Sequence, residues 1–426
     1  MDQSSAAYAE NRARFLAMMQ EGSALFLFAG SAPAKRGDAF YPFTPQRNFL
    51  YLTGLGAPNL ILFMEKKEGQ GTATLFTERR SERGALWVGE VLSHGEAEAV
   101  SGIGRLMYID EFTAFAEDAL FKNRYAAAYL DLENRSLDAP PTPDVAFAAK
   151  LRGRFPALRV EDARGLFGPL RLIKSPWEVE RIKKAIACTA EGFALMMRHA
   201  APGMHENEVE AYFDFALKKN GARHGFGTIA ASGGNATVLH YVKNRAKTRD
   251  GDLILVDAGA EWEYYSADVT RTFPMNGRFT DRQRELYGIV LEANRKVIEA
   301  VRPRCPFSRL NEIAKEHYAS ELKRIGLIED AGGVQKHYYH SVSHMLGLET
   351  HDIGQDDAKE LAPGMVLTVE PGLYVAEEGI GIRIEDDVLV TDAGCEVLSS
   401  AIPKDPEDIE RAMAKAGAAQ GLGARG

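Results

Sequence analysis

Two capping boxes, about a hundred residues apart, constrain the fold more than any other feature of this sequence. Residues 175–178 read SPWE and residues 280–283 read TDRQ. Each box predicts the start of a pair of helices, because apolar residues then recur at helical spacing as far as the next Pro or Gly. Strands are predicted after each pair, at 253–256 and 268–273 the first time and at 366–370 and 381–390 the second. This recurrence predicts an internal duplication with a functional site between the two halves.

The residues before the first box predict a separate α/β region. A helix is expected at 8–19 and strands at 24–29, 60–64, 72–77 and 126–130, with a charged turn at 65–71. We therefore expect an α/β (α+β) protein with an N-terminal α/β domain over residues 1–170 and a catalytic domain over 175–403. A C-terminal tail over 404–426 would form a short amphipathic helix at most.

Composition narrows the classes of function. The chain has 426 residues with 51 Lys and Arg against 60 Asp and Glu, a net charge of −9 that disfavours nucleic-acid binding. No apolar run reaches the roughly 18–20 residues that span a bilayer, and the polar N-terminus is unlike a signal peptide. Cys188, Cys305 and Cys395 are isolated in sequence, so no disulfide framework is expected. We expect a cytoplasmic protein without nucleic-acid or membrane partners, and we interpret the basic run 243–249 as a solvated loop.

Four carboxylates stand in or at the ends of predicted strands, namely Asp257, Asp268, Glu370 and Glu385. Each has an ordinary alternative: Asp257 begins the turn-like sequence DAG, and the others could lie on solvated strand faces. Strand alternation would put Arg383 on the same face as Glu385.

A cluster of histidines favours a functional site over these ordinary structural roles. Three of the 10 histidines in the chain fall within twelve residues, namely His340, His344 and His351. Such clustering predicts metal ligation or proton transfer. Two aspartates, two glutamates and a histidine form a hard, oxygen-rich set that suits two divalent cations, with Mn²⁺ favoured and cobalt, zinc and iron left open.

Residues 176–400 resemble the pita-bread metallopeptidases, which include aminopeptidase P, prolidase and methionine aminopeptidase. The resemblance is carried by VDAG at 256–259, SADVTR at 266–271, SHMLG at 343–347, EPG at 370–372 and IRIED at 382–386. It implies a pita-bread fold in which Asp257 chelates one metal ion, Asp268 and Glu385 bridge the pair, and His344 with Glu370 complete the other.

The N-terminal residues are similar to the N-terminal domain of aminopeptidase P. The similar segments are YPF at 41–43, NFLYLTG at 48–54 and LWVG at 86–89. Asn48 stands where that family usually has Asp. Creatinase shares the fold but lacks the metal ligands, whereas this chain has all five.

The resemblance implies a hydrolase that releases the residue N-terminal to proline, and self-association as a dimer or tetramer. Glu370 would act as general base and then general acid, and Arg383 would orient Glu385. Histidines beside the metals, His240, His340 and His351, would contact the scissile amide, and substrate contacts are expected at His240, His351, Tyr374 and Trp87. The alternatives are a Xaa-Pro dipeptidase with the same chemistry, and a metal-dependent binding protein or catalytically silent scaffold.

Overall fold

The structure, a computed structural model, describes residues 3–89, 91–134, 136–355 and 358–420. The chain divides into two compact units, Met1–Leu170 and Arg171–Gly426. Each unit has its own sheets and its own buried apolar core.

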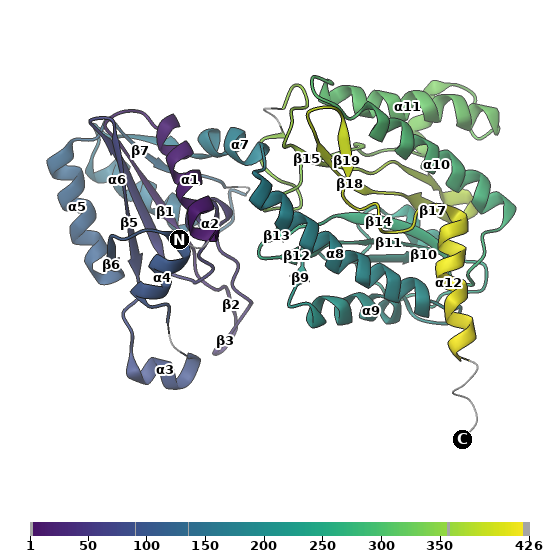
Figure 1. Ribbon diagram of the computed structural model, residues 1–426, viewed down its shortest axis with the longest axis horizontal. Coiled ribbons are helices and arrows are strands. Elements are labelled where there is room, and N and C mark those ends of the chain that lie inside the picture. The colour runs from purple at the N-terminus through teal and green to yellow at the C-terminus, as the bar shows by residue number, and fades with distance from the viewer. Residues whose placement is uncertain (1–2, 90, 135, 356–357, 421–426) are drawn as a thin grey trace. The chain divides into compact units, whose positions relative to one another are not determined.

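The first unit is built on a six-stranded sheet with the order β6-β5-β4-β1-β7-β8 (Figure 1). The strands of this sheet are β1 Ser23–Phe28, β4 Ile61–Lys67, β5 Gln70–Thr77, β6 Leu106–Tyr108, β7 Ala127–Leu130 and β8 Arg159–Asp162, and a small hairpin pairs β2 Ala34–Arg36 with β3 Ala39–Phe40. The helices of this unit are α1 Gln3–Met18, α2 Arg47–Thr53, α3 Glu82–Val88, α4 His94–Ser101, α5 Phe112–Asn123 and α6 Pro143–Arg154. Helix α7 Arg164–Leu172 begins in this unit, and its last two residues belong to the second.

One face of this sheet packs against α5 and α6. Phe26 of β1 and Phe63 of β4 pack with Phe112 of α5 and Leu151 of α6 in one buried cluster. The charged turn expected at 65–71 is much shorter than predicted, because β4 and β5 pair as far as Lys67 and Gln70. A two-residue hairpin turn with positive φ at Glu68 and Gly69 suffices to reverse the chain.

Asn48 has a structural role inside this unit. Its side chain is buried, and Nδ2 donates a hydrogen bond of 2.7 Å to Oδ2 of Asp131. The side-chain amide of Gln46 also donates to Asp131. Burial raises the pKa of Asp131, and these donors offset part of the cost of its charge. An Asp at position 48 would instead meet the Asp131 carboxylate.

We therefore expect Asn48→Asp to lower the free energy of unfolding by about 2–3 kcal/mol at pH 7.5. The two carboxylates would raise each other's pKa in the folded state, so the loss should shrink as the pH falls toward 5. Urea unfolding at both pH values measures this. Asn59→Asp is the matched control, since exposed Asn59 donates to Glu78 in the same way. Equal losses in the two variants would contradict the argument.

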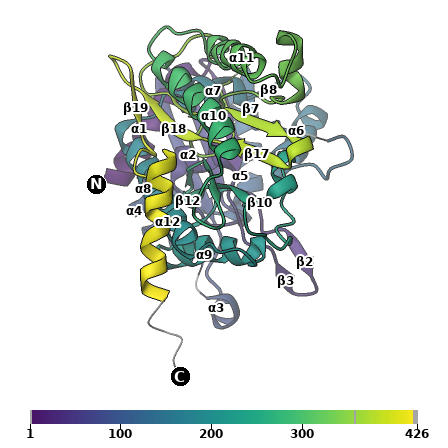
Figure 2. The same ribbon diagram turned by 90° about the vertical axis from the view of Figure 1, so that its right-hand side faces the viewer.

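The second unit contains the two helix pairs that the sequence predicts, and both capping boxes are present. Ser175 N donates to Glu178 at 2.8 Å, and Thr280 N donates to Gln283 at 2.9 Å. The first pair is α8 Pro176–His199 with α9 Glu206–Lys219, and the second is α10 Asp281–Ala300 with α11 Phe307–Arg324. Figures 1 and 2 both show α9 on one side of the strands of this unit and α11 on the other.

The strands that follow each helix pair form several small sheets. The first half contributes the sheet β10-β11-β14 and the sheet β13-β12-β9, and the second half contributes β15-β18-β19 and the pair β16-β17. Their bounds are β9 Arg223–His224, β10 Ile229–Ser232, β11 Leu253–Ala258, β12 Ala260–Trp262, β13 Tyr265–Ser266, β14 Val269–Pro274, β15 Val366–Val369, β16 Gly372–Val375, β17 Ile380–Arg383, β18 Asp386–Val390 and β19 Cys395–Val397.

Two of the predicted strands differ from the sequence expectation. Asp257 lies within β11 rather than in a turn, because β11 stays paired with β14 as far as Ala258. The strand expected at 381–390 is broken at residues 384–385, since β17 pairs with β16 whereas β18 pairs with β15. Glu385 therefore lies between two sheets, and simple alternation does not fix its side-chain direction.

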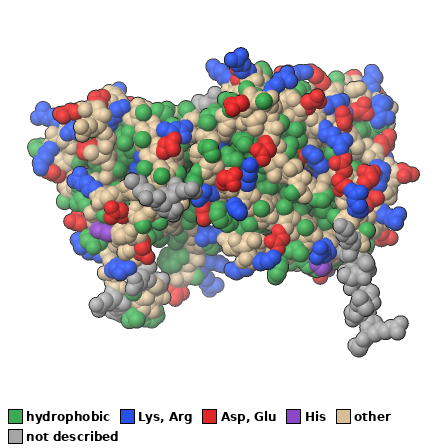
Figure 3. Space-filling view, in the orientation of Figure 1, with side chains coloured by type: hydrophobic (Ala, Val, Ile, Leu, Met, Phe, Trp, Pro, Cys, Tyr) green, Lys and Arg blue, Asp and Glu red, His purple; other side chains and the backbone are tan. Residues whose placement is uncertain are grey.

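Residues 406–420 form helix α12, Pro406–Gln420. Ile409 and Met413 belong to the main buried cluster of the second unit, so this helix is part of the core. Acidic and basic side chains are interspersed on the face of the second unit seen in Figure 3. Among the described residues, no helix has the length and apolar character needed to cross a membrane.

Candidate metal centre

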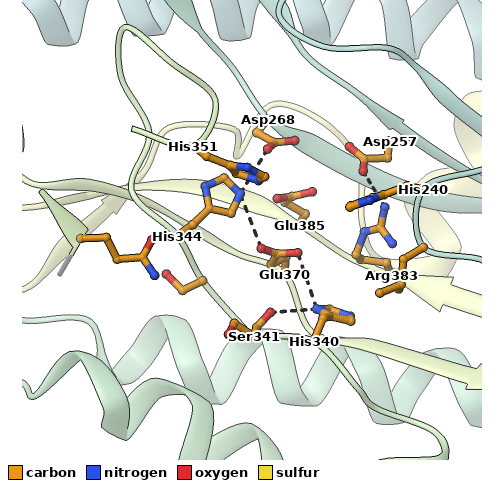
Figure 4. Close-up of a pocket in the computed structure, with 13 residues that line it drawn as sticks. His240, Asp257, Asp268, His340, Ser341, His344, His351, Glu370, Arg383 and Glu385 are labelled. Carbon is orange, nitrogen blue, oxygen red and sulfur yellow. Dashed lines mark hydrogen bonds and ion pairs between the residues drawn. The ribbon is translucent and has the colours of Figure 1, made fainter. Parts of the chain in front are cut away.

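Nine of the predicted site residues line one cavity of about 430 Å³ in the second unit (Figure 4). They come from segments far apart in sequence, including β11, the residue before β14, the loop before β15, the end of β17 and the residues that follow β15 and β17. The nine are His240, Asp257, Asp268, His340, His344, His351, Glu370, Arg383 and Glu385.

The ligand-type atoms converge at the centre of this cavity. Asp268, His344 and Glu385 each offer one such atom within 4.8 Å of the others. Nε2 of His344 lies 3.3 Å from Oδ2 of Asp268 and 3.6 Å from Oε1 of Glu370. The antiparallel pairing of β11 with β14 brings Asp257 near Asp268, since Ala258 is opposite Val269.

The carboxylates of the cavity are largely buried and lie close to one another. Burial and the charge of Glu385 raise the pKa of Asp268 well above its ordinary value, and the same two causes raise that of Glu370. Burial and Asp257 raise the pKa of Glu385 to about 7. Without a counter-ion these groups take up protons, and a bound cation would remove that repulsion.

Arg383 is the cation that the chain itself supplies, but its partners differ from the predicted ones. Its Nη2 lies 2.5 Å from Oδ2 of Asp257. Its Nε donates to Oγ1 of Thr270 at 3.0 Å, and Thr270 in turn donates to Glu385 at 2.6 Å. Arg383 therefore contacts Asp257 directly and Glu385 through Thr270, because the break between β17 and β18 separates the two side chains.

The residues present fit divalent cations. Oδ1 of Asp257 is buried and has no hydrogen-bond partner among the described residues, although a buried carboxylate oxygen normally has one. Four acidic side chains face a single guanidinium, which leaves negative charge to compensate. Oxygen ligands with one imidazole form a hard donor set of the kind that binds Mn²⁺ or a similar ion.

The histidine His340 is held in one orientation. Its Nδ1 lies 2.8 Å from the carbonyl oxygen of Ser341, and its Nε2 lies 2.9 Å from the hydroxyl of Tyr374. Nη1 of Arg383 donates to the same hydroxyl at 3.0 Å. Burial and Arg383 lower the pKa of His340 to about 4, so the ring is neutral at pH 7. Tyr374 itself is buried behind His340 and is not among the described residues that line the cavity.

His351 is exposed and lines the cavity, and the centroid of its ring lies 4.3 Å from that of His344. The next residue, Asp352, is buried and pairs with Arg171 and with Lys174, at 3.1 Å for Lys174 Nζ. Burial works against the charge of Asp352, but these two cations hold its pKa below the ordinary value. This buried network fixes the chain beside His351.

The sequence expectations missed several residues of the site. Thr368 accepts a hydrogen bond from the backbone N of His344 at 3.1 Å and its hydroxyl lies 3.4 Å from Oε1 of Glu370. Thr270 links Arg383 to Glu385 as described above. Thr270 and Thr368 each stand two residues from a predicted ligand, so the period-two alternation of a strand could have found them. The cavity lining also includes Leu239, Ser341, Ser343 and Gln355.

Trp87 lies in the first unit, on α3, and the residue is 81% exposed. Its predicted contact with substrate stays a prediction.

Comparison with known proteins decides the family. The model of metallopeptidase family M24 matches residues 180–392, and the model of the aminopeptidase P N-terminal domain matches residues 8–128. A Xaa-Pro aminopeptidase of Escherichia coli K12 is 33% identical over 96% of this chain and 98% of its own length. The chain belongs to metallopeptidase family M24.

Solved structures agree with this membership of family M24. A candidate aminopeptidase P from Bacillus anthracis is 44% identical, with a TM-score of 0.94 over 97% of this chain and 99% of that one. Aminopeptidase P from E. coli with the inhibitor Pro-Leu is 33% identical, with a TM-score of 0.89 over 98% of this chain and 100% of that one. The predicted family and α/β fold class are confirmed, and this M24 protein is a metal-dependent peptidase that uses divalent metal.

Proposed function

We propose that this protein is a two-metal aminopeptidase that releases the N-terminal residue from peptides with proline at the second position. The observation that carries the proposal is the convergence of five ligand-type side chains in one cavity. Relatives that match nearly the whole chain are Xaa-Pro aminopeptidases, and the E. coli enzyme binds Pro-Leu as an inhibitor. The side chains that would hold the two ions are Asp257, Asp268, His344, Glu370 and Glu385.

Divalent cations held by these residues would lower the pKa of the attacking water and polarise the scissile carbonyl. Glu370 accepts the proton of that water and returns it to the leaving proline nitrogen, as general base and then general acid. His240 and His351 both line the cavity, and they would donate hydrogen bonds to the oxygen that gains negative charge. His340 is neutral and its ring is held by Tyr374, so it would help to orient the substrate and would add no charge to the site.

The cavity favours an aminopeptidase over a Xaa-Pro dipeptidase. A dipeptidase needs a cation that binds the free carboxylate of its substrate and so penalises a longer chain. Arg383 is the one Lys or Arg in the described lining of the cavity. Its guanidinium already contacts Asp257, Thr270 and Tyr374, which leaves it poorly placed for that task.

A panel of three peptides tests this proposal. We expect Ala-Pro-Ala to be cleaved in the presence of Mn²⁺ with kcat/KM at least comparable to that of Ala-Pro. Ala-Ala-Ala should be a poor substrate, because the pocket next to the scissile bond is proposed to fit the proline ring. Initial rates of release of the N-terminal alanine give all three values.

The same panel separates the alternatives. Cleavage of Ala-Pro alone would favour the dipeptidase. No cleavage of any peptide by protein loaded with metal would favour a binding protein or scaffold on this fold.

We further propose Mn²⁺ as the metal, because the ligand set is rich in oxygen. We also propose a cytoplasmic protein that assembles as a dimer or tetramer. The three cysteines are free, which suits a reducing compartment. Elemental analysis of protein purified without added metal tests the identity of the metal. The mass of the protein in solution, measured by light scattering, tests the dimer or tetramer.

A further inference from the structure

One buried carboxylate outside the metal centre holds the loop that carries His240. Glu206 is the first residue of α9 and is fully buried. Its side chain belongs neither to the cavity lining nor to the proposed ligand set. The loop that it contacts joins the short helix Gly233–Thr237 to β11.

The contacts of Glu206 reach both sides of His240. Oε1 accepts hydrogen bonds from the backbone N of Ser232 at 2.8 Å, from its hydroxyl at 2.7 Å and from Nδ2 of Asn235 at 2.9 Å. Oε2 accepts from the hydroxyl of Tyr241 and from the backbone N of Ala246, both at 2.8 Å. Five donors therefore converge on one carboxylate, which saturates its acceptor positions.

Glu206 holds the part of the loop next to His240. The later part has other anchors, since Asn244 bonds to Thr228, Ala230 and Glu210, and Thr248 bonds to Met204. Residues 238–252, all of them described, contain no helix or strand beyond the single bridge between His205 and Lys247. Tyr241, directly after His240, is fixed by its bond to Glu206. The ring of His240 then lies on the Asp257 side of the cavity in Figure 4.

The charge of Glu206 is also supported where it lies. Burial works against ionisation, but the hydrogen bonds from Asn235 and Ser232 outweigh it and lower the pKa of Glu206. The N-terminus of α9 adds a favourable partial positive charge. The five donors are thus matched to an ionised carboxylate, and the amide group of a Gln side chain cannot accept all five hydrogen bonds.

We propose that Glu206 is a positioning residue that fixes His240 for its contact with the substrate through the hydrogen bonds to Ser232, Asn235, Tyr241 and Ala246. This inference rests on the proposed function, since it assigns Glu206 to the same reaction. Glu206 lies outside the cavity lining and acts on His240 through the residues that it binds on both sides of it.

Glu206→Gln tests the proposal, because Gln keeps the shape but points an amide N–H group at loop donors. We expect kcat/KM for Ala-Pro-Ala to fall by about 10-fold or more while metal content stays unchanged. Glu208→Gln is the matched control, since exposed Glu208 on the same helix turn bonds only to His205 N in the described contacts. That control should retain its kcat/KM.

Two readouts separate positioning from general damage. Lys243, Arg245, Lys247 and Arg249 are exposed in the loop, so trypsin should cut Glu206→Gln there about 10-fold faster than the unsubstituted protein. In a double-mutant cycle, Glu206→Gln should add less than about 2-fold to the loss already caused by His240→Ala. Fully additive losses, or unchanged kcat/KM with an unchanged tryptic pattern, would overturn the proposal.

Tyr241→Phe covers the case in which Glu206→Gln does not fold. It removes one donor beside His240 and leaves the carboxylate in place, so a smaller loss of kcat/KM is expected, again absent on the His240→Ala background. An additive loss in that cycle would overturn the anchor. If the unsubstituted protein cleaves no peptide, the proposed function fails while the tryptic comparison still tests the anchor. If it cleaves Ala-Pro-Ala and Glu206→Gln does so equally, the anchor alone fails.

Discussion

Glu370→Gln is expected to lower kcat by about 10²-fold or more with little change in KM. The amide keeps an oxygen that can bind a metal ion, but it cannot accept a proton from water and return it to the proline nitrogen. In the structure Glu370 follows β15 and lies 3.6 Å from Nε2 of His344, so its carboxylate is inside the proposed centre. Initial rates on Ala-Pro-Ala at saturating Mn²⁺ measure the effect.

Metal content and a surface control complete that experiment. Glu396→Gln makes the same change on β19, where Glu396 pairs with Lys183 at 3.1 Å and is half-exposed, and its kcat should stay within about 2-fold of the original. Glu370→Gln should retain its metal by elemental analysis. Near-normal turnover in this variant would remove Glu370 from the mechanism.

Asp268→Ala should lose metal binding and with it the metal-dependent rise in Tm. Asp268 is buried between Glu385, Asp257 and His344, and its loss removes a predicted bridging ligand. A ligand that binds only the folded state raises Tm, so a weaker site gives a smaller rise when Mn²⁺ is added. Elemental analysis and thermal unfolding with and without Mn²⁺ measure this. Full metal occupancy in the variant would contradict the role of Asp268.

Without metal, rising pH should destabilise the unsubstituted protein more than it destabilises Asp268→Ala. In the folded state without metal, Glu385 has a pKa of about 7 and that of Asp268 is also raised. Carboxylates with a raised folded-state pKa contribute stability at low pH that is lost as the pH rises through that pKa. Chelated protein should therefore lose stability between about pH 5 and pH 8. Asp268→Ala should lose less, because it removes one of the repelling charges.

Asp250→Asn is the control for both parts of this experiment. Asp250 is exposed and accepts a hydrogen bond from Asn276 at 2.8 Å, so its substitution should change neither metal occupancy nor the pH dependence. A similar loss of stability with pH in chelated Asp268→Ala and chelated unsubstituted protein would contradict the repulsion argument.

Local features of the sequence placed the first helix, the two helix pairs of the second unit and several strands, but they left out helices α2 to α7 and short strands such as β6 and β8. Helices α8 and α10 begin where their capping boxes predict, because a cap depends on residues within one turn. Strand β11 follows from a short apolar run and β14 lies close to its predicted range, although the sequence could not show that their pairing continues through Asp257. That pairing depends on a partner strand whose contact no local pattern contains.

The sequence by itself determined which residue types could form the site, since five ligand-type residues stand in motifs that resemble those of a known family. Tertiary structure alone decided their partners. Arg383 contacts Asp257 across 126 residues of sequence, and Glu206 contacts Ala246 across 40. Such contacts arise when separate elements pack, so the helical or strand periodicity of the sequence cannot predict them. The chemistry of the centre was therefore readable in the sequence, whereas the support that orients it required the folded chain.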